Sequence, residues 1–357
     1  MLLTAAICCL VSGSFLFAQC PQFDPGFSTG TIQSGDIDEA SGLAASRKNP
    51  YVLWTHNDKG GSARLFAMNI DGTHLGIYNL FGASNRDWED IAVGPGPVGG
   101  LNYIYVGEIG DNDGVHSSIM VYRVPEPQVD ANQSPVELTV TGVETITLQY
   151  PDGARDAEAL MVDPLTKDIY IISKRDEHPR LYRAPYPQST TQTTIMEYKC
   201  ELPWEALTYW DWVTAGDISP DGSEVIVRSY DNASIWQRPS DANLWDAFGQ
   251  TECPVQLLTG SETLGEAVCF VSGFACGYMT TSEGTHSLIN YFPRIFKADL
   301  DENCHVDFRD FSFLASAWLS APGDDNWNSD CDISDPNDSF IDANDLAVFV
   351  GDWLTNK

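Results

Sequence analysis

The stretch EDIAVGPGPVGGLNYIYVGEIGDNDGVHSSIMVYRVP, from Glu89 to Pro125, contains three apolar segments separated by turn residues. The first segment, EDIAVGP, opens with an acidic residue. The second, YVGEIGDND, ends in a polar cluster, and the third, IMVYRVP, follows after a short connection. Short apolar runs bounded by Gly, Pro, Asn and Asp are typical of β-strands. This stretch therefore predicts three consecutive strands joined by short loops.

The same arrangement occurs five times in all between residues 21 and 297. A fourth strand separates the copies, for example HLGIYNL, ETITLQYP and PVQLLTG. Four-stranded units that repeat every roughly 50–70 residues are typical of β-propeller blades. The five copies open with EASGLAAS from Glu39, EDIAVGP from Glu89, EALMVDP from Glu158, DISPDGS from Asp217 and EAVCFVS from Glu266.

The expected fold is therefore mainly β, a propeller of five blades over residues 21–297. A sixth blade stays open, because PWEALTYW around Glu205 is an imperfect further match. The N-terminal segment GFSTGTIQ is a candidate for the outer strand of the last blade, where it would close the ring.

In a propeller, the innermost strand of each blade lines a central channel, so the acidic residues that open the copies would meet at one end of it. A mixed ring of acidic and basic groups suits a metal ion, a phosphate, an ester or a sugar. Alternatively, these residues cap strands or bond neighbouring blades. Asn57 and Asn112 also lie in the polar clusters at the ends of second strands. The candidate channel residues are Glu39, His56, Asp58, Glu89, Glu108, Asp111, Glu158, Lys174, Arg175, Asp217, Arg228, Glu266 and Glu283.

The phrases EASGLAAS, DWEDIAVGP, GEIGDN and GDISPDG resemble a group of bacterial secreted propellers that is loosely related to phytase-like and esterase-like propellers. The resemblance implies at most a calcium-assisted hydrolase of phosphoesters or esters. The sequence contains no G-x-S-x-G motif and no obvious Ser-His-Asp set.

A second, shorter repeat occupies residues 299–357. DFRDFSFLASAWL (307–319) matches DANDLAVFVGDWL (342–354) at an offset of 35 residues. At helical spacing, one face of the first copy carries Phe311, Leu314, Ala315, Trp318 and Leu319. The repeat predicts two loop-helix units packed as a pair, and so small a module needs a metal or a disulfide to be stable.

Each predicted helix follows a loop rich in oxygen-bearing side chains. In DLDENCHVDFRD (299–310), these side chains have the spacing of an EF-hand calcium loop. Position 6 is Cys304 rather than Gly, and position 12 is Asp rather than Glu. The expected calcium ligands are Asp299, Asp301, Asn303, the carbonyl of His305, Asp307 and Asp310.

The second loop, DISDPNDSFIDAND (332–345), is two residues longer. Asp342 and Asp345 occupy its last two ligand positions. The insertion leaves the earlier positions open, and Asn337 is an alternative to Asp338. The expected early ligands are Asp332, Ser334, Asp338 and the carbonyl of Phe340.

This duplicated pattern resembles the type I dockerin module, which carries two calcium loop-helix units. The resemblance covers about 59 residues and implies two Ca²⁺ ions, a cohesin-like partner and attachment to an assembly that acts on polysaccharide. The alternative is a calcium-stabilised tail that has no such partner. The sequence also leaves open whether a further ion binds in the propeller channel.

The formal net charge of −32 argues against nucleic acid and anionic membranes as partners, because phosphate contacts require clustered Lys and Arg. It suits divalent cations. The C-terminal 59 residues alone carry 14 acidic and two basic side chains. Without cations, this module would repel itself.

The first 18 residues have the pattern of a secretory signal peptide, which predicts an extracellular protein without a stable membrane span. Lipid attachment at Cys20 is the less favoured alternative. Secretion implies disulfides. The expected pairs are Cys269–Cys276, Cys304–Cys331 and Cys200–Cys253, which would leave Cys20 unpaired.

Overall fold

The computed structural model describes residues 20–355 except 259, 261, 263, 272–274, 302, 305 and 335. The predicted signal peptide and the carbonyl of His305 lie outside the described residues. Among the residues that are described, no helix combines the length and the apolar character that crossing a membrane requires.

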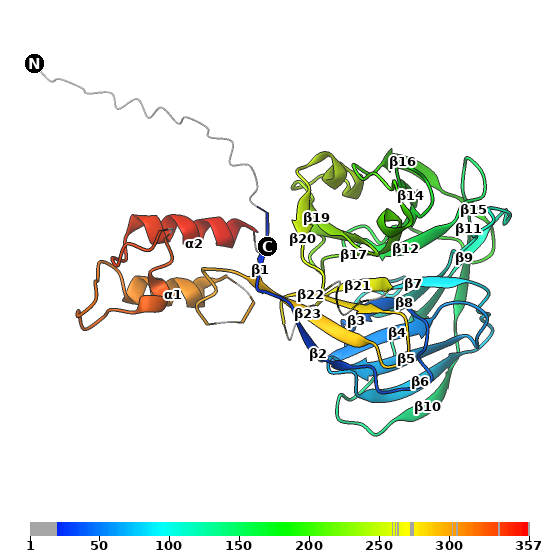
Figure 1. The fold of residues 1–357 in the computed structure, drawn as a ribbon, viewed down its shortest axis with the longest axis horizontal. Coiled ribbons are helices and arrows are strands. Elements are labelled where there is room, and N and C mark those ends of the chain that lie inside the picture. Colours follow the sequence, from blue (N-terminus) through cyan, green and yellow to red (C-terminus); the bar gives the residue numbers. More distant parts are fainter. Residues whose placement is uncertain are drawn as a thin grey trace, which may run out of the picture.

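Five β-sheets are arranged as a five-bladed propeller, as the sequence predicts (Figure 1). The innermost strands contact one another in the order β3, β7, β12, β17 and β21, and β21 contacts β3 again, so the ring is closed. From the inside outward, the first blade contains β3 (Ala40–Ala45), β4 (Val52–Asn57), β5 (Arg64–Asn69) and β6 (His74–Leu80), and the second contains β7 (Trp88–Pro95), β8 (Asn102–Glu108), β9 (Ile119–Pro125) and β11 (Glu144–Gln149). The third blade contains β12 (Ala157–Val162), β13 (Ile169–Ser173), β14 (Arg180–Ala184) and β16 (Glu197–Glu201), and the fourth contains β17 (Val213–Ile218), β18 (Glu224–Ser229), β19 (Ala233–Gln237) and β20 (Cys253–Val255). The fifth blade contains β21 (Gly265–Val271), β22 (Gly277–Ser282), β23 (Leu288–Ile295) and β2 (Phe27–Thr31), and β1 (Gln22–Phe23) also pairs with β23.

The apolar core of the propeller consists of five clusters, and each one lies between two neighbouring blades. Both faces of a blade are therefore covered. This explains why the inner strands are apolar without alternation, as in the fully buried ALMV segment of β12.

The N-terminal strand closes the ring. β2 pairs antiparallel with β23 of the last blade, which confirms the role expected for GFSTGTIQ. The strand lies close to the neighbouring blade, because a Cβ on Gly30 would meet the carbonyl oxygen of Asp71 at 2.1 Å. The last blade is thus built from both ends of the propeller sequence.

Two further strands pair with a neighbouring blade, an arrangement that the sequence did not predict. β10 (Val136–Val140) leaves the second blade and pairs parallel with β6 of the first. β15 (Thr194–Ile195) leaves the third blade and pairs parallel with β11 of the second. Backbone hydrogen bonds therefore join the outer edges of three consecutive blades.

The segment PWEALTYW does not form a sixth blade. It lies in the connection before β17, where Trp204 and Ala206 pack against the core between the third and fourth blades. Its end forms a short 3₁₀ helix, η1 (Tyr209–Asp211). A second 3₁₀ helix, η2 (Leu244–Gly249), precedes β20.

The C-terminal module lies beside the propeller and contains α1 (Phe308–Ser316), η3 (Ser329–Cys331) and α2 (Ala343–Thr355) (Figure 1). It has an apolar cluster of its own, which includes Leu314, Ala317 and Phe349. The predicted apolar face of the first helix is only partly correct. Leu314 is buried and Trp318 is half-buried, whereas Phe311, Ala315 and Leu319 are exposed. Leu319 lies beyond the end of α1 and has a φ of 57°, so its backbone does not continue the helix.

All three predicted disulfide pairs are wrong. The structure instead pairs Cys20 with Cys253 and Cys276 with Cys304, and Cys200, Cys269 and Cys331 are free. Cys269 lies opposite Met279 in the β21–β22 ladder, so it is not opposite Cys276. The Cys20 sulfur, which a lipid anchor would use, is occupied by a bond to the fourth blade.

Candidate functional site

A β-bulge at the start of every inner strand determines which side chains reach the channel. In each blade, the ladder between the first two strands skips one residue of the inner strand. An unpaired residue at a bulge is turned out of the regular alternation of the strand. The bulged residues are Ser41, Glu89, Glu158, Thr214 and Glu266.

Four of these bulged residues line one polar cavity of about 240 Å³ in the propeller. Thr214 does not, because its hydroxyl is buried and donates to the Gly265 carbonyl oxygen at 3.0 Å. The Ser41 hydroxyl similarly donates to the Glu89 carbonyl oxygen at 2.6 Å. The cavity is lined by Ser41, Asp58, Lys59, Glu89, Asn112, Glu158, Lys174, Arg175, Tyr209, Tyr230, Glu266 and Glu283.

Seven of the thirteen predicted channel residues belong to this cavity. They are Asp58, Glu89, Glu158, Lys174, Arg175, Glu266 and Glu283. Glu39 is excluded because it precedes the bulge by two residues and is exposed. Asp217 follows the bulge by three residues, is half-buried, and accepts hydrogen bonds from the backbone amides of Ile218 and Phe270 at 2.8 Å each.

The other four excluded residues have structural roles. The His56 ring is fully buried, and burial lowers its pKa to about 4. Glu108 accepts from the Tyr122 hydroxyl at 3.3 Å and lies 3.6 Å from Arg86. Asp111 accepts from the amides of Val115 and His116, and Arg228 forms a buried ion pair with Glu262 at 2.9 Å.

Five cavity or neighbouring residues were missed by the sequence argument: Ser41, Lys59, Asp87, Tyr209 and Tyr230. One signal was available for Tyr230. It comes directly after the second strand of its blade, as Asp58, Lys174 and Glu283 do in theirs. Tyr209 comes from η1 and stacks on Tyr230, with ring centroids 4.5 Å apart.

Lys174 is the central cation of the cavity. Its Nζ donates to Glu158 and, at 3.0 Å, to the Tyr230 hydroxyl. Burial alone would lower the pKa of Lys174, but Glu158 and Glu266 raise it above its ordinary value. Lys174 therefore remains charged and offsets part of the negative charge around it.

The buried glutamates have raised pKa values. Burial is the main cause for Glu89 and Glu158, and each is also raised by a nearby carboxylate. Burial raises the pKa of Glu266 to about 7, although Lys174 opposes the shift. A carboxyl group with a pKa near neutrality can either give or take a proton at that pH.

Three carboxylates of the first two blades offer a place for a metal ion. One oxygen atom from each of Asp58, Asp87 and Glu89 lies within 4.8 Å of the others. All three are oxygen ligands, which suits hard cations such as Ca²⁺ and Mg²⁺.

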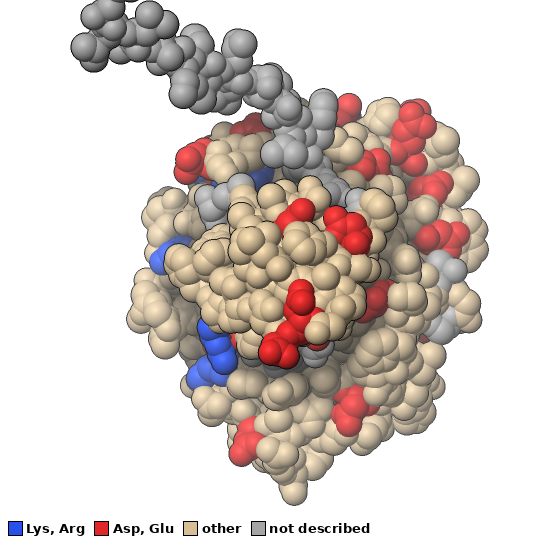
Figure 2. Space-filling model, turned by 90° about the vertical axis from the view of Figure 1, so that its left-hand side faces the viewer, with Lys and Arg blue, Asp and Glu red and all other residues tan. Residues whose placement is uncertain are grey.

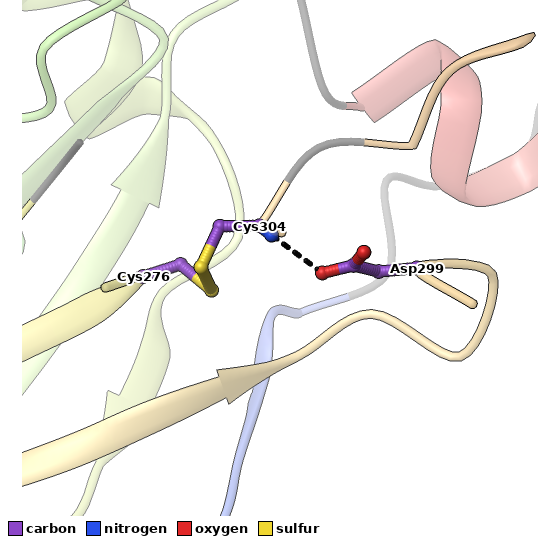
Figure 3. A group of neighbouring side chains, drawn as sticks. All are labelled: Cys276, Asp299 and Cys304. Carbon is purple, nitrogen blue, oxygen red and sulfur yellow. Dashed lines mark hydrogen bonds between the residues drawn. A yellow bond between two sulfur atoms is a disulfide. The ribbon is translucent and has the colours of Figure 1, made fainter. Parts of the chain in front are cut away.

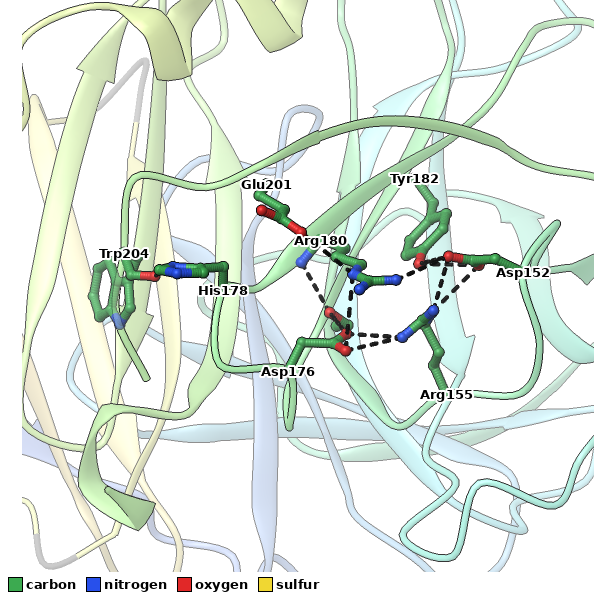
Figure 4. A network of polar contacts seen from close by, with 9 residues as sticks. Asp152, Arg155, Asp176, His178, Arg180, Tyr182, Glu201 and Trp204 are labelled. Atoms are coloured by element: carbon green, nitrogen blue, oxygen red, sulfur yellow. Dashed lines mark hydrogen bonds and ion pairs between the residues drawn. The ribbon is translucent and has the colours of Figure 1, made fainter. Parts of the chain in front are cut away.

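A second polar network lies on the third blade (Figure 4). The Arg155 guanidinium donates to Asp152 at 2.8 Å and to Asp176 at 2.9 Å. Arg180 donates to Asp152 at 3.1 Å, and the Tyr182 hydroxyl donates to the same carboxylate. Because these charges are paired with one another, we assign this network a structural role.

The two acidic loops of the C-terminal module have matching hydrogen bonds. The Asp310 carboxylate accepts from the amides of Leu300, Asp301 and Asp307, and Asp345 accepts from the equivalent amides of Ile333, Ser334 and Asp342. Both carboxylates are fully buried. The carboxylate at position 12 of each loop, which lies in the first turn of the helix, thus connects the loop to that helix through three backbone hydrogen bonds.

The first ligand position also matches between the loops. Asp299 accepts from the amide of Cys304, which has a φ of 70° (Figure 3). Asp332 accepts from the amide of Ser339, which has a φ of 62°. Both residues thus make, without glycine, the left-handed bend that an EF-hand loop requires at position 6.

This match aligns the longer loop with the shorter one. If Ser339 is position 6, Asp338 is position 5 and Phe340 is position 7, as predicted, although the Asp338 side chain is exposed and accepts from the Phe340 amide. The alternative ligand Asn337 instead donates to the Asp332 carbonyl oxygen at 2.9 Å.

Each loop keeps one buried carboxylate oxygen without a hydrogen bond from any described residue. These atoms are Oδ1 of Asp301 and Oδ1 of Asp332. In the first loop, oxygens of Asp299, Asp301 and Asp310 lie within 4.8 Å of one another. Buried oxygens without partners fit a bound cation, since leaving them unpaired is unfavourable.

Comparisons with known proteins give little beyond these observations. No family model and no curated protein matches the chain. One similar solved structure is a luciferin-regenerating enzyme, with a TM-score of 0.40, 9% identity and coverage of 74% of this chain and 94% of the other. Another is a nidogen/laminin complex, with a TM-score of 0.39, 11% identity and coverage of 69% and 73%. The fold and sites themselves define a five-bladed β-propeller with a polar cavity and an appended pair of loop-helix units.

Proposed function

We propose that this chain is a secreted calcium-binding protein whose dockerin-like C-terminal module attaches the propeller to an extracellular assembly concerned with polysaccharide. The observation that carries the proposal is the matching geometry of the two acidic loops, each with a buried carboxylate oxygen that has no partner among the described residues. Two disulfides suit an oxidising compartment.

Two Ca²⁺ ions would be held by the carboxylates at positions 1, 3, 9 and 12 of the first loop and by their equivalents in the second. Position 3 is Asp301 in the first loop and Ser334 in the second, whereas position 5 is Asn303 in the first and Asp338 in the second, so each site has four carboxylates. The bound ions would neutralise part of the negative charge of the module, and scattered acidic side chains are visible on the face of the molecule shown in Figure 2. Calcium that binds only the folded module stabilises it by mass action.

Exposed apolar side chains support a protein partner for the module. Phe308 is 76% exposed, Phe313 43% and Val350 45%, although the module has a core of its own. Aromatic side chains are enriched at protein–protein interfaces relative to the rest of the surface. A cohesin-like domain is the partner that the resemblance of the loops suggests.

Calcium titration of the chain that begins at Cys20 tests the calcium sites by calorimetry. We expect Asp301→Asn to weaken one site and Asp332→Asn to weaken the other by tenfold or more. Asp325→Asn, which removes the same charge from the module outside both loops, should leave the affinities within about twofold. Unchanged calcium binding in both loop variants would contradict the proposal.

The attachment is tested separately by measuring binding of the same chain to a panel of purified cohesin domains. We expect binding in calcium that is lost in EDTA and in the Asp301→Asn/Asp332→Asn variant. Calcium binding without any cohesin partner would favour the alternative of a stabilising tail.

A second candidate function is hydrolysis in the propeller cavity. The observation that favours it is Glu266, which has a pKa of about 7 and lies in a cavity with Glu158 and Lys174. Such a set can supply general acid or base catalysis on a glycosidic, ester or phosphoester bond. Hydrolysis that is lost in Glu266→Gln and Glu158→Gln but retained in Glu205→Gln, an exposed site outside the cavity, would support it.

A further inference from the structure

The wall of the propeller cavity contains a group of three carboxylates that form no ion pair with a buried basic side chain among the described residues. Asp58 follows β4, Asp87 precedes β7, and Glu89 occupies the bulge of β7. One oxygen atom of each lies within 4.8 Å of the others. When all three are ionised, carboxylates at this separation repel one another, and a cation bound between them would relieve the repulsion.

Glu89 gives a second, independent indication of a ligand. It is 5% exposed and lines the cavity, yet its carboxylate makes no hydrogen bond or ion pair with any residue that the structure describes. Oδ1 of Asp58 and Oδ1 of Asp87 are also buried without a partner among those residues. Buried carboxylate oxygens are ordinarily paired or bound to a metal ion.

The basic side chains nearby do not fill this role. Lys59 Nζ lies 3.8 Å from Asp58, but its side chain is 58% exposed, so the contact is weak. Arg86 is 3.6 Å from Glu108 instead. Elsewhere in the cavity, Lys174 donates a hydrogen bond to Glu158, and Arg175 donates one to Asp156.

Gly110 makes room for the group. A Cβ at this position would lie 2.1 Å from Oε1 of Glu89 and 2.6 Å from Oδ2 of Asp87. The absence of a side chain therefore lets both carboxylates lie against the backbone of the loop after β8. A larger residue at this position would displace one or both of them.

We propose that Asp58, Asp87 and Glu89 bind one hard divalent cation in the wall of the propeller cavity. The ligand set contains only oxygen atoms, which favours Ca²⁺ or Mg²⁺ over Zn²⁺ or Cu²⁺. Three carboxylates leave coordination positions for water or for an oxygen-bearing ligand in the cavity of about 240 Å³. This site is separate from the two loops of the C-terminal module and does not depend on them.

Calorimetric titration of the chain that begins at Cys20 with CaCl₂ and, separately, with MgCl₂ tests the site. The background is the Asp301→Asn/Asp332→Asn variant, so that the module sites are weakened. We expect one equivalent of one of these ions to bind. Glu89→Gln and Asp87→Asn, made singly, should each weaken this binding by tenfold or more, and Glu283→Gln, another cavity carboxylate, by no more than about threefold.

A second measurement does not require the variants to fold equally well. Crystals of the unaltered chain soaked in MnCl₂ should show an anomalous difference peak between the three carboxylates. No heat of binding at millimolar CaCl₂ or MgCl₂, together with no such peak, overturns the proposal. An ion that binds with equal affinity to Glu89→Gln and to the parent chain overturns it as well. The titration is made in the variant whose module sites are already weakened. Its result therefore does not depend on whether the C-terminal module binds calcium.

Discussion

Glu266 lies in the cavity with Lys174 and Glu283 near it, and its carboxyl group is nearly fully buried. Burial is the main reason that its pKa rises from 4.5 to about 7, and Glu283 adds to the shift. An acid whose pKa is raised on folding is more easily protonated in the folded chain than in the unfolded chain. Its contribution to stability is therefore complete below pH 4.5 and is lost as the pH rises through 7.

We expect Glu266→Gln to change how stability depends on pH. Gln does not ionise, so the variant should gain stability relative to the parent as the pH rises from 4.5 to 7, by roughly 1–3 kcal/mol. Urea unfolding in EDTA at several pH values measures the difference. Glu205→Gln, at an exposed position, should follow the parent curve. A constant difference between Glu266→Gln and the parent across this range would contradict the expectation.

On the inner strands, the sequence predicts a cavity residue correctly only where the acidic residue that opens the segment also occupies the bulge. Glu89, Glu158 and Glu266 open their segments and also occupy the bulge. Glu39 and Asp217 open theirs as well, but the bulged residues of those blades are Ser41 and Thr214. A shift of one residue sends a side chain to the other face of a strand. The bulge is set by pairing between strands, which the sequence of one strand does not reveal.

At the scale of strands, the sequence predicts best what depends on local pattern. Four strands per blade and the closing role of β2 follow from apolar runs and turn residues. The pairing of β10 and β15 with a neighbouring blade could not be predicted in this way, because each strand is short, largely exposed, and paired with a strand far away in the sequence. The Cys20–Cys253 disulfide was missed for the same reason, since its two cysteines are 233 residues apart.

The Cys20–Cys253 disulfide should stabilise the closed ring. It joins the segment before β1 to β20 of the fourth blade, and so restricts nearly the whole propeller in the unfolded state. We expect Cys20→Ser/Cys253→Ser to lower the free energy of unfolding by about 2–4 kcal/mol. Urea unfolding under non-reducing conditions measures this. Cys200→Ser, which removes a free thiol, should have little effect, and equal stability of both variants would contradict the role assigned to the disulfide.

At the scale of the whole molecule, the Cys276–Cys304 disulfide joins the last blade to the first acidic loop (Figure 3). Cys304 is also the residue with the left-handed bend, and its amide donates to Asp299 at 2.7 Å. The propeller therefore holds the loop in the conformation proposed to bind calcium. In the second loop, Ser339 makes the equivalent bend without a disulfide.

Calcium binding by the first loop should therefore depend on the propeller, and calcium binding by the second should not. In a Cys276→Ser background, Cys304→Gly should bind calcium in the first loop more tightly than Cys304→Ala. The left-handed bend costs alanine about 1 kcal/mol, which corresponds to roughly fivefold in affinity. Both should bind less tightly than the parent, whose disulfide holds the bend in place. Calorimetry resolves the two module sites when the second is weakened by Asp332→Asn. Equal affinities in the parent, Gly and Ala chains would show that the disulfide joins the two parts without preparing the loop for calcium.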